Sequence, residues 1–231
     1  MARQSLRENL ARVREDIARV QAHEGINDEV RIVAVTKGHP AEVVREALEE
    51  GLRDLGENRV QEGLAKIEVL ADAEACWHLI GHLQTNKAKH IPGRFAWVHS
   101  VDSLRVARAL QQAMERAARS ERLRVLVQVN VAGEAQKNGC APSIAADVAQ
   151  QVAESPALDL RGLMTMAPFV DDERVQRRVF GDLRHLRERL EAVGLPLPEL
   201  SMGMSGDYRA AVAEGATIVR LGTVLFGERS I

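Results

Sequence analysis

The residue best suited to covalent chemistry is Lys37, one of only five lysines among 31 basic residues. It ends the apolar run RIVAVTK at 31–37, which predicts a buried strand. Burial of an ammonium is costly, so it lowers the pKa of a lysine and frees the amine to form a Schiff base. A lysine that merely extends to solvent from a strand end is the alternative. The other four lysines lie in predicted helices, beside a short helix or in a loop: Lys66, Lys87, Lys89 and Lys137.

Arg220 is the second unusual residue, because it stands in the apolar run IVRL at 218–221, which also predicts a buried strand. A buried guanidinium needs an acceptor such as a carboxylate, a phosphate or a ring nitrogen. A structural ion pair with Glu57 or Asp207 is the alternative to a ligand.

Two glycine-containing segments form the third feature: SMGMSGD at 201–207 and LGTVLFG at 221–227. Small residues let a ligand approach the backbone, and the N-terminus of a helix attracts anions. Turns explain most glycines taken singly. The two segments together favour a phosphate site, because barrels often bind phosphate between the loops after strands seven and eight.

The elements that must position these residues alternate between strands and helices along the whole chain. An amphipathic helix comes first, with apolar residues spaced 4-3-4-3 from Leu6 to Val20. Helices are then expected between successive strands, the longest of them over 173–192. The strands are predicted at 31–37, 52–58, 77–82, 96–102, 124–131, 160–167, 200–205 and 217–227.

This alternation predicts an α/β fold: a single (β/α)8 TIM-type barrel over residues 1–231. We expect an extra N-terminal helix and no helix after the last strand. A doubly wound sheet is the alternative, but no GxGxxG motif follows the first strand.

Chemistry in barrels occurs at the carboxyl ends of the strands. Reading those ends gives a polar set on apolar strands: Lys37, Glu57, Asn58, His82, Gln84, His99, Asp102, Asn130, Thr165, Met166, Ser205, Arg220, Gly222 and Thr223.

The composition narrows the classes of partner that we expect for this protein. The net charge of −2 carries no basic surplus for nucleic acid, and aromatic residues are only 3%. Cys76 and Cys140 lie in no metal-binding spacing, so we expect reduced thiols and no metal. The charges of the first 16 residues argue against a signal peptide, so we expect none. No uncharged stretch reaches the length of a membrane span. We therefore expect a cytoplasmic protein.

A Schiff-base lysine and a phosphate site in one barrel mouth suggest two ligand classes. One is a phosphorylated sugar in a Schiff-base aldolase. The other is pyridoxal 5′-phosphate (PLP), an aldehyde that carries a phosphate. Arg220 favours PLP, because the pyridine nitrogen would give the guanidinium its acceptor.

Eight segments that span nearly the whole chain in order carry a family resemblance: AVTKGHP at 34–40, GENRVQE at 56–62, WHLIGHLQTNKAKH at 77–90, HSVD at 99–102, QVNVAGEAQKNG at 128–139, GLMTMAP at 162–168, SMGMSGD at 201–207 and VRLGTVLFG at 219–227. With them the sequence resembles the pyridoxal phosphate homeostasis protein family (YggS/PROSC type), whose barrels are related to the N-terminal domain of alanine racemase. Small departures are a threonine at 36 where serine is common, and Arg59 where an aromatic residue is frequent.

The resemblance implies a role for each of six residues. Lys37 would form the internal aldimine with PLP, and Arg220 would face the pyridine nitrogen. Asn58 would line the cofactor pocket. The phosphate would be held by Ser205, Gly222 and Thr223.

The resemblance also implies PLP and amino-/keto-acid homeostasis without robust catalytic activity, and hence no catalytic residue. PLP-dependent apoenzymes are the implied recipients of the cofactor, and the chain is expected to be a monomer. The alternative is a PLP-dependent amino-acid racemase of low activity. Racemisation needs proton carriers on both faces of the substrate carbon. Related racemases take the second one, a tyrosine, from another domain and a partner subunit, whereas the one tyrosine here is Tyr208.

Overall fold

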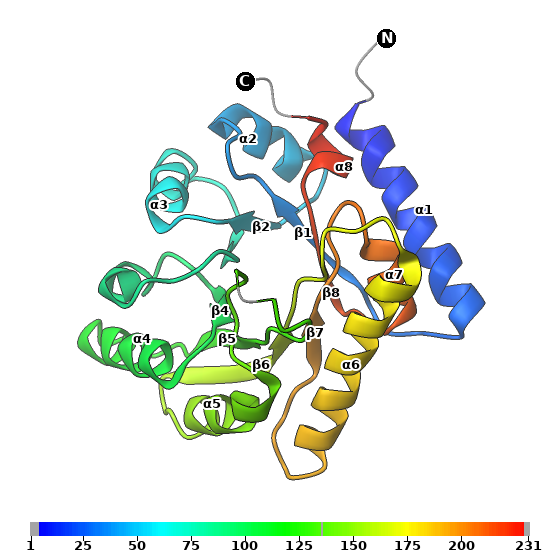
Figure 1. Ribbon diagram of the computed structural model, residues 1–231. Coiled ribbons are helices and arrows are strands. Elements are labelled where there is room, and N and C mark those ends of the chain that lie inside the picture. Colours follow the sequence, from blue (N-terminus) through cyan, green and yellow to red (C-terminus); the bar gives the residue numbers. More distant parts are fainter. Residues whose placement is uncertain (1–4, 135, 229–231) are drawn as a thin grey trace.

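The computed structural model describes residues 5–134 and 136–228 and contains a closed barrel of eight parallel strands (Figure 1). The strands follow one another around the barrel in chain order, and the last closes it against the first, with Arg220 beside Val33. The predicted TIM-type barrel is therefore confirmed, and the doubly wound alternative is wrong. The strands are β1 Arg31–Val35, β2 Asp54–Glu57, β3 Cys76–Leu79, β4 Trp97–Val101, β5 Leu123–Gln128, β6 Leu158–Met164, β7 Glu199–Ser201 and β8 Ile218–Leu221.

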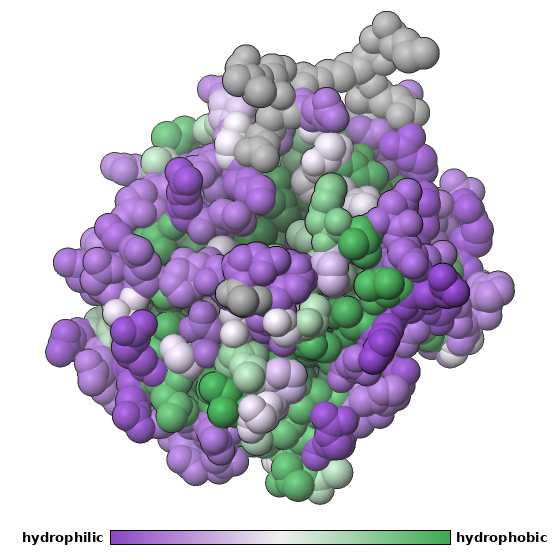
Figure 2. Space-filling view, viewed as in Figure 1, coloured by the Kyte–Doolittle hydropathy of each residue, from purple (hydrophilic) through white to green (hydrophobic). Residues whose placement is uncertain are grey.

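Helices surround the barrel, and most of them fall in the intervals that the sequence predicts. Figure 2 shows that hydrophilic residues cover most of the face seen in Figure 1, as expected for a ring of amphipathic helices. No helix of the described residues is long and apolar enough to cross a bilayer. The helices are α1 Leu6–Glu24, α2 Ala41–Glu49, α3 Val60–Val69, η1 Thr85–His90, α4 Leu104–Arg116, η2 Pro142–Ile144, α5 Ala145–Ala153, α6 Glu173–Glu191, α7 Tyr208–Ala213 and α8 Thr223–Phe226.

The extra helix α1 is present as predicted and packs against α7 and α8 on the side of the barrel where the sheet closes (Figure 1). Ser5 and Glu8 form a capping box at its start, which satisfies backbone N–H groups that the first turn leaves without partners. Its buried face includes Leu10, Val13 and Ile17, in agreement with the predicted period.

The end of the chain differs from the prediction. A strand was expected over 217–227 with no helix after it, but β8 ends at Leu221 and the short helix α8 follows. The segment is apolar throughout, so its composition does not distinguish a strand from a helical turn. Gly222 (φ −119°, ψ −83°) leaves the extended conformation, and Leu225 is then buried against the core. The side-chain amide of Asn9 on α1 donates to the Leu225 carbonyl over 2.8 Å and so holds this turn in place.

Two apolar clusters hold the barrel together. The larger one lies between the strands and the helices. The smaller one joins strands from around the barrel, and we assign it to the barrel interior. Because side chains alternate along a strand, residues two positions from an interior one also face inward. Ile218 of this cluster therefore places Arg220 and Gly222 inside, and Trp97 places His99 inside. The smaller cluster contains Val33, Trp97, Leu126, Met164 and Ile218.

Candidate functional site

Lys37 is half-buried and lies in the turn that leaves β1, at the carboxyl end of the barrel. The backbone on both sides of it is anchored. The carbonyl of Thr36 accepts a hydrogen bond from Nζ of Lys66 at 2.7 Å, and the N–H of Gly38 donates to Oε1 of Glu62 at 2.5 Å. The lysine is therefore carried by a turn that is fixed at its two neighbours.

A buried charged cluster behind this turn supplies the anchors. Nζ of Lys66 contacts Oε1 of Glu57 at 2.6 Å and Oε1 of Glu62 at 3.0 Å. The hydroxyl of Thr36 donates to Oε1 of Glu57 over 2.6 Å. Burial raises the pKa of Glu57, although Lys66 and Thr36 act against it. Sequence reasoning found Glu57 but missed Lys66, whose helical position gave no sign of burial.

Arg220 is 3% exposed, and the acceptors that its guanidinium finds among the described residues are neutral. Nη1 donates to Oγ of Ser201 at 2.7 Å, and Nη2 donates to the Thr165 carbonyl at 2.9 Å. Among the described residues, no carboxylate lies within ion-pair distance of it, so the expected alternative of a direct pair with Glu57 or Asp207 is wrong. Burial lowers the pKa of Arg220 to about 10, and the charge of Asp207 opposes this only in part.

The loops after β7 and β8 meet as the two glycine segments predict. Oγ of Ser205 accepts hydrogen bonds from the N–H groups of Gly222 and Val224, each at 3.2 Å. Thr223 lies between these two amides and is exposed. Gly203 (φ +91°) makes the turn possible, because a Cβ there would lie 2.7 Å from Cβ of Ala211. Two amides and two hydroxyls are thus collected in one place.

Asn58 is half-buried at the exit of β2. The segment that leaves β3 passes very close to it, because a Cβ on Gly81 would lie 2.2 Å from the carbonyl oxygen of Asn58. Close backbone contact therefore sets the position of Asn58, next to the turn that carries Lys37.

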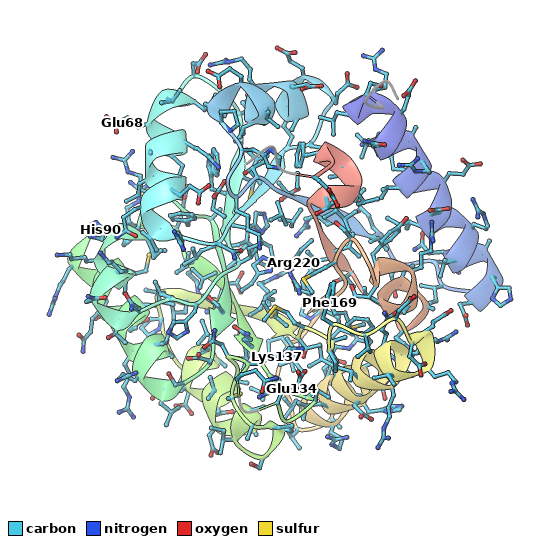
Figure 3. The ribbon with its side chains drawn as sticks, turned by 45° about the horizontal axis from the view of Figure 1, so that its top comes forward. Glu68, His90, Glu134, Lys137, Phe169 and Arg220 are labelled. Atoms are coloured by element: carbon cyan, nitrogen blue, oxygen red, sulfur yellow. The ribbon has the colours of Figure 1, made fainter. Side chains whose placement is uncertain are left out.

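Other strand-end residues have structural partners. The imidazole of His82 lies 3.4 Å from Asp102, and the Thr165 hydroxyl donates to the Val129 carbonyl. Nδ2 of Asn130 donates to the Glu134 carbonyl at the base of the loop after β5. Figure 3 shows Lys137 and Glu134 of this loop side by side, and Nζ of Lys137 lies 2.6 Å from the Glu134 carboxylate and donates to the Ala167 carbonyl.

Tyr208 points away from the barrel mouth. Its hydroxyl donates to Oδ2 of Asp16 on α1 over 2.8 Å, and the side chain is buried. Burial and this hydrogen bond raise the pKa of Tyr208 to about 12. A phenol held in this way is a poor candidate for moving protons at Lys37.

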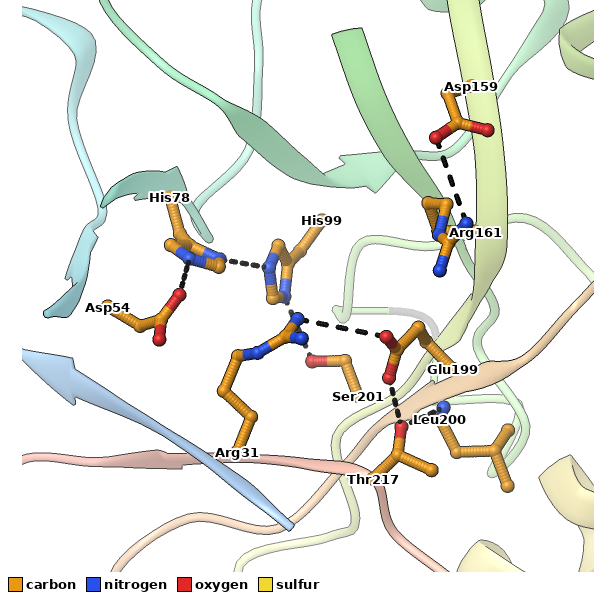
Figure 4. Close-up of polar contacts among 10 residues, drawn as sticks. All are labelled: Arg31, Asp54, His78, His99, Asp159, Arg161, Glu199, Leu200, Ser201 and Thr217. Atoms are coloured by element: carbon orange, nitrogen blue, oxygen red, sulfur yellow. Dashed lines mark hydrogen bonds and ion pairs between the residues drawn. The ribbon is translucent and has the colours of Figure 1, made fainter. Parts of the chain in front are cut away.

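A polar chain through the barrel interior was not predicted from the sequence. Figure 4 shows Asp54, His78, His99 and Ser201 joined in succession by dashed contacts. The three contacts are 2.8 Å from Asp54 Oδ1 to His78 Nε2, 2.9 Å from His78 Nδ1 to His99 Nε2, and 2.9 Å from His99 Nδ1 to Ser201 Oγ. Arg220 completes the chain through its own bond to Ser201. His99, expected at the mouth, is instead wholly buried inside the barrel.

The sequence signal for this hydrogen-bonded chain is the two-residue period of inward positions along each strand. Each member stands at an inward position of its strand, two residues apart from apolar interior residues or from glycine. Cys76 lies beside Asp54 and His78, a group of possible metal ligands that the sequence spacing does not reveal. The guanidinium groups of Arg31 and Arg124 lie over the Trp97 ring next to it, and their positive charge disfavours a cation.

Comparison with known proteins shows which family this chain belongs to. The family model described as alanine racemase, N-terminal domain, matches residues 8–230. A protein of Pseudomonas aeruginosa named pyridoxal phosphate homeostasis protein is 45% identical over 226 residues, which cover 97% of this chain and 96% of that protein. The chain belongs to the pyridoxal phosphate homeostasis protein family.

Solved structures agree with the family assignment. PipY of Synechococcus elongatus with PLP bound superposes with a TM-score of 0.84 at 36% identity, covering 96% of this chain and all of that chain. An alanine racemase of Clostridium difficile in complex with cycloserine superposes with a TM-score of 0.76 at 16% identity, covering 98% of this chain and 60% of that one. The likeness to the racemase shows a shared fold alone. The family resemblance found in the sequence is confirmed by the family model and by the 45% identical relative.

Proposed function

We propose that this chain binds PLP in the mouth of the barrel as a Schiff base on Lys37. We propose further that residues 1–231 act as one PLP-binding domain in PLP and amino-/keto-acid homeostasis, without robust catalytic activity. The observation that carries the proposal is the buried guanidinium of Arg220, which has neutral protein acceptors only. A guanidinium has five N–H donors, and a heteroaromatic nitrogen is an acceptor that fits those left over.

The residues present suit each part of PLP. Lys37 offers the amine for the aldehyde, from a turn that Lys66 and Glu62 hold on both sides. The amides of Gly222 and Val224 now donate to Ser205 Oγ and would turn to the phosphate, and the Thr223 hydroxyl is exposed beside them. Such donors fit a phosphate. Asn58 would line the pocket between these groups.

The same residues support a binding role over catalysis. PLP, when bound, supplies an electron sink whose strength depends on protonation of its ring nitrogen. Arg220 cannot accept a proton, so it would hold that nitrogen unprotonated. Lys37 could move a proton on one face of a substrate carbon. Tyr208, which would be needed on the other face, is bonded to Asp16 and buried.

The proposal also covers the cellular compartment of the protein and its partners. Cys76 and Cys140 are free thiols, and burial raises their pKa to about 11 and about 12, which keeps them protonated and unreactive. Free thiols support a reducing compartment, which we propose to be the cytoplasm. We propose that the chain acts as a monomer and that PLP-dependent apoenzymes receive its cofactor.

An absorbance titration with PLP tests the binding proposal. The wild type and Lys137→Ala should both develop the visible band of a protein-bound Schiff base. Lys37→Ala should lack the band while keeping its far-ultraviolet circular dichroism. Lys137 is the matched control, because it is another lysine, and its Nζ donates to the Ala167 carbonyl after β6. Loss of the band in Lys137→Ala but not in Lys37→Ala would contradict the proposal.

A D/L amino-acid assay on folded, PLP-loaded protein separates homeostasis from the racemase alternative. No appreciable turnover with common amino acids is expected. A kcat near the ~10 s⁻¹ that is typical of enzymes would instead establish the racemase.

A further inference from the structure

The hydrogen-bonded chain inside the barrel runs from Asp54 through His78, His99 and Ser201 to Arg220. Its two ends carry opposite charges. Arg220 lies at one end, bonded to Ser201, and Asp54 lies at the other, bonded to His78. A buried guanidinium needs compensating negative charge. Asp207 supplies part of it without pairing directly with Arg220. Asp54 is the carboxylate that the chain connects to Arg220, through four hydrogen bonds and residues from β2, β3, β4, β7 and β8.

The two ends fix the direction of every hydrogen bond between them. The guanidinium is only a donor, so Ser201 Oγ accepts from Arg220. The carboxylate of Asp54 is only an acceptor, so His78 carries a hydrogen on Nε2. If both rings are neutral, His78 Nδ1 must accept from His99 Nε2–H, and His99 Nδ1 must accept from the Ser201 hydroxyl. Every contact then has one donor and one acceptor.

Two other patterns would satisfy the contacts: His78 as a cation that donates to both Asp54 and His99, or His99 as a cation that donates to both His78 and Ser201. The surroundings disfavour both. His78 is fully buried and stacks on Trp97, and the cations Arg31 and Arg124 lie over the same ring. Burial lowers the pKa of His78 despite Asp54. Burial and the charges of His78, Arg220 and Arg31 lower that of His99 further.

We propose that Asp54 is a second counter-charge of Arg220, beside Asp207, relayed across the barrel by a one-way hydrogen-bond chain through His78, His99 and Ser201. These residues are positioning residues for Arg220, and both imidazoles are neutral with their hydrogen on Nε2. The chain fixes the guanidinium from the interior side. Resting on the proposed function, it also orients the remaining N–H groups of Arg220 toward the ring nitrogen of PLP.

Nitrogen-15 NMR of histidine-labelled protein without PLP tests the chain itself. His78→Gln and His99→Gln assign the two ring systems. Both rings should show a protonated Nε2 and an unprotonated Nδ1 at pH 7. A doubly protonated His78, or a hydrogen on Nδ1 of either ring, would overturn the proposal. The measurement does not involve PLP, so it stands or fails separately from the proposed function.

Variants at the two ends test the effect on Arg220. Asp54→Asn keeps an acceptor oxygen for His78 but removes the charge. Coupling through packed residues changes affinity by about 0.5–2 kcal/mol, so the Kd for PLP should rise roughly 3- to 30-fold. Glu199→Gln is the matched control: Glu199 begins β7 and pairs with Arg31 and Thr217 outside the chain, so its removal should leave the Kd unchanged. Equal Kd values for wild type and Asp54→Asn would overturn the proposal.

Ser201 gives an independent check near the mouth. Ser201→Ala removes the link between Arg220 and His99 with little change in volume, whereas Ser201→Thr keeps the hydroxyl. Ala should raise the Kd for PLP about fivefold or more and shift the nitrogen-15 resonance of His99 Nδ1, which loses its hydrogen-bond donor, and Thr should restore both. The hydrogen on His99 Nε2 should stay in place, because Asp54 and His78 still fix it from the other end. An unchanged Nδ1 resonance in folded Ser201→Ala would overturn the relay.

Discussion

The hydroxyl of Tyr208 donates a buried hydrogen bond to Asp16, and this contact joins helices α7 and α1 across 192 residues of sequence. Arg19 and Arg209 also pair with the Asp16 carboxylate. Burial would raise the pKa of Asp16, but the hydrogen bonds from Arg209 and Tyr208 outweigh it and hold that pKa below its usual value. Tyr208 thus acts in packing rather than at the mouth.

Tyr208→Phe should therefore lower stability without changing the ligand site. Hydrogen bonds to charged groups contribute about 1.5–3 kcal/mol, and the arginines keep part of the stabilisation, so the loss should be near the lower end. Urea unfolding measures it, and the PLP-induced absorption band should be unchanged. A variant of wild-type stability whose band is lost would place Tyr208 at the cofactor instead.

Lys66 should be essential for the buried cluster behind Lys37. Lys66→Met leaves the carboxylate of Glu57 buried without its cation, and breaking such a pair costs about 3–5 kcal/mol. The double variant Lys66→Met/Glu57→Gln removes both charges and should recover much of that stability. Denaturant titrations of the two variants decide the matter. Equal stabilities would show that Glu57 does not depend on Lys66.

Thr223→Val tests the phosphate loop. The side chain is exposed, so stability should change by less than about 0.5 kcal/mol. The substitution keeps the shape but removes a hydroxyl donor, so the Kd for PLP should rise about tenfold or more. Fluorescence titration gives the Kd. The prediction fails if valine binds PLP as tightly as threonine does.

The interior histidines predict how stability changes with pH. The folded protein holds His78 and His99 neutral with lowered pKa values, whereas unfolded histidine takes up a proton near pH 6.5. The unfolded state then binds more protons, so stability falls as pH drops below about 6.5, approaching about 1.4 kcal/mol per pH unit for each histidine. His99→Gln should lose about half of this slope between pH 6.5 and 5.5. Parallel pH profiles for variant and wild type, from unfolding free energies, would refute the assignment.

Much of the barrel could be predicted from the sequence, because most strands are apolar runs and the longer helices have a clear buried face. The boundaries around 217–227 could not, because the apolar segment TVLF suits a strand and a helical turn equally. The backbone hydrogen bonds of the turn, and the contact between Asn9 of α1 and the Leu225 carbonyl, become visible only in the structure.

The residues of the candidate site also divide into those that the sequence indicates and those that it does not. Local patterns indicate Lys37, Arg220 and the loops with Ser205, because each places an unusual residue type at a strand end. The interior chain depends on the register between strands that are distant in sequence. His99 and Ser201, for example, are 102 residues apart, and no local pattern predicts that they touch.

The central claim is that Lys37 carries PLP. Borohydride reduction of the PLP-loaded chain, followed by peptide mapping, tests it most directly, because reduction makes the bond between amine and cofactor permanent. The account predicts the pyridoxyl group on the peptide that contains Lys37. A label on Lys66, Lys87, Lys89 or Lys137 in preference to Lys37, or no label at all, would contradict it.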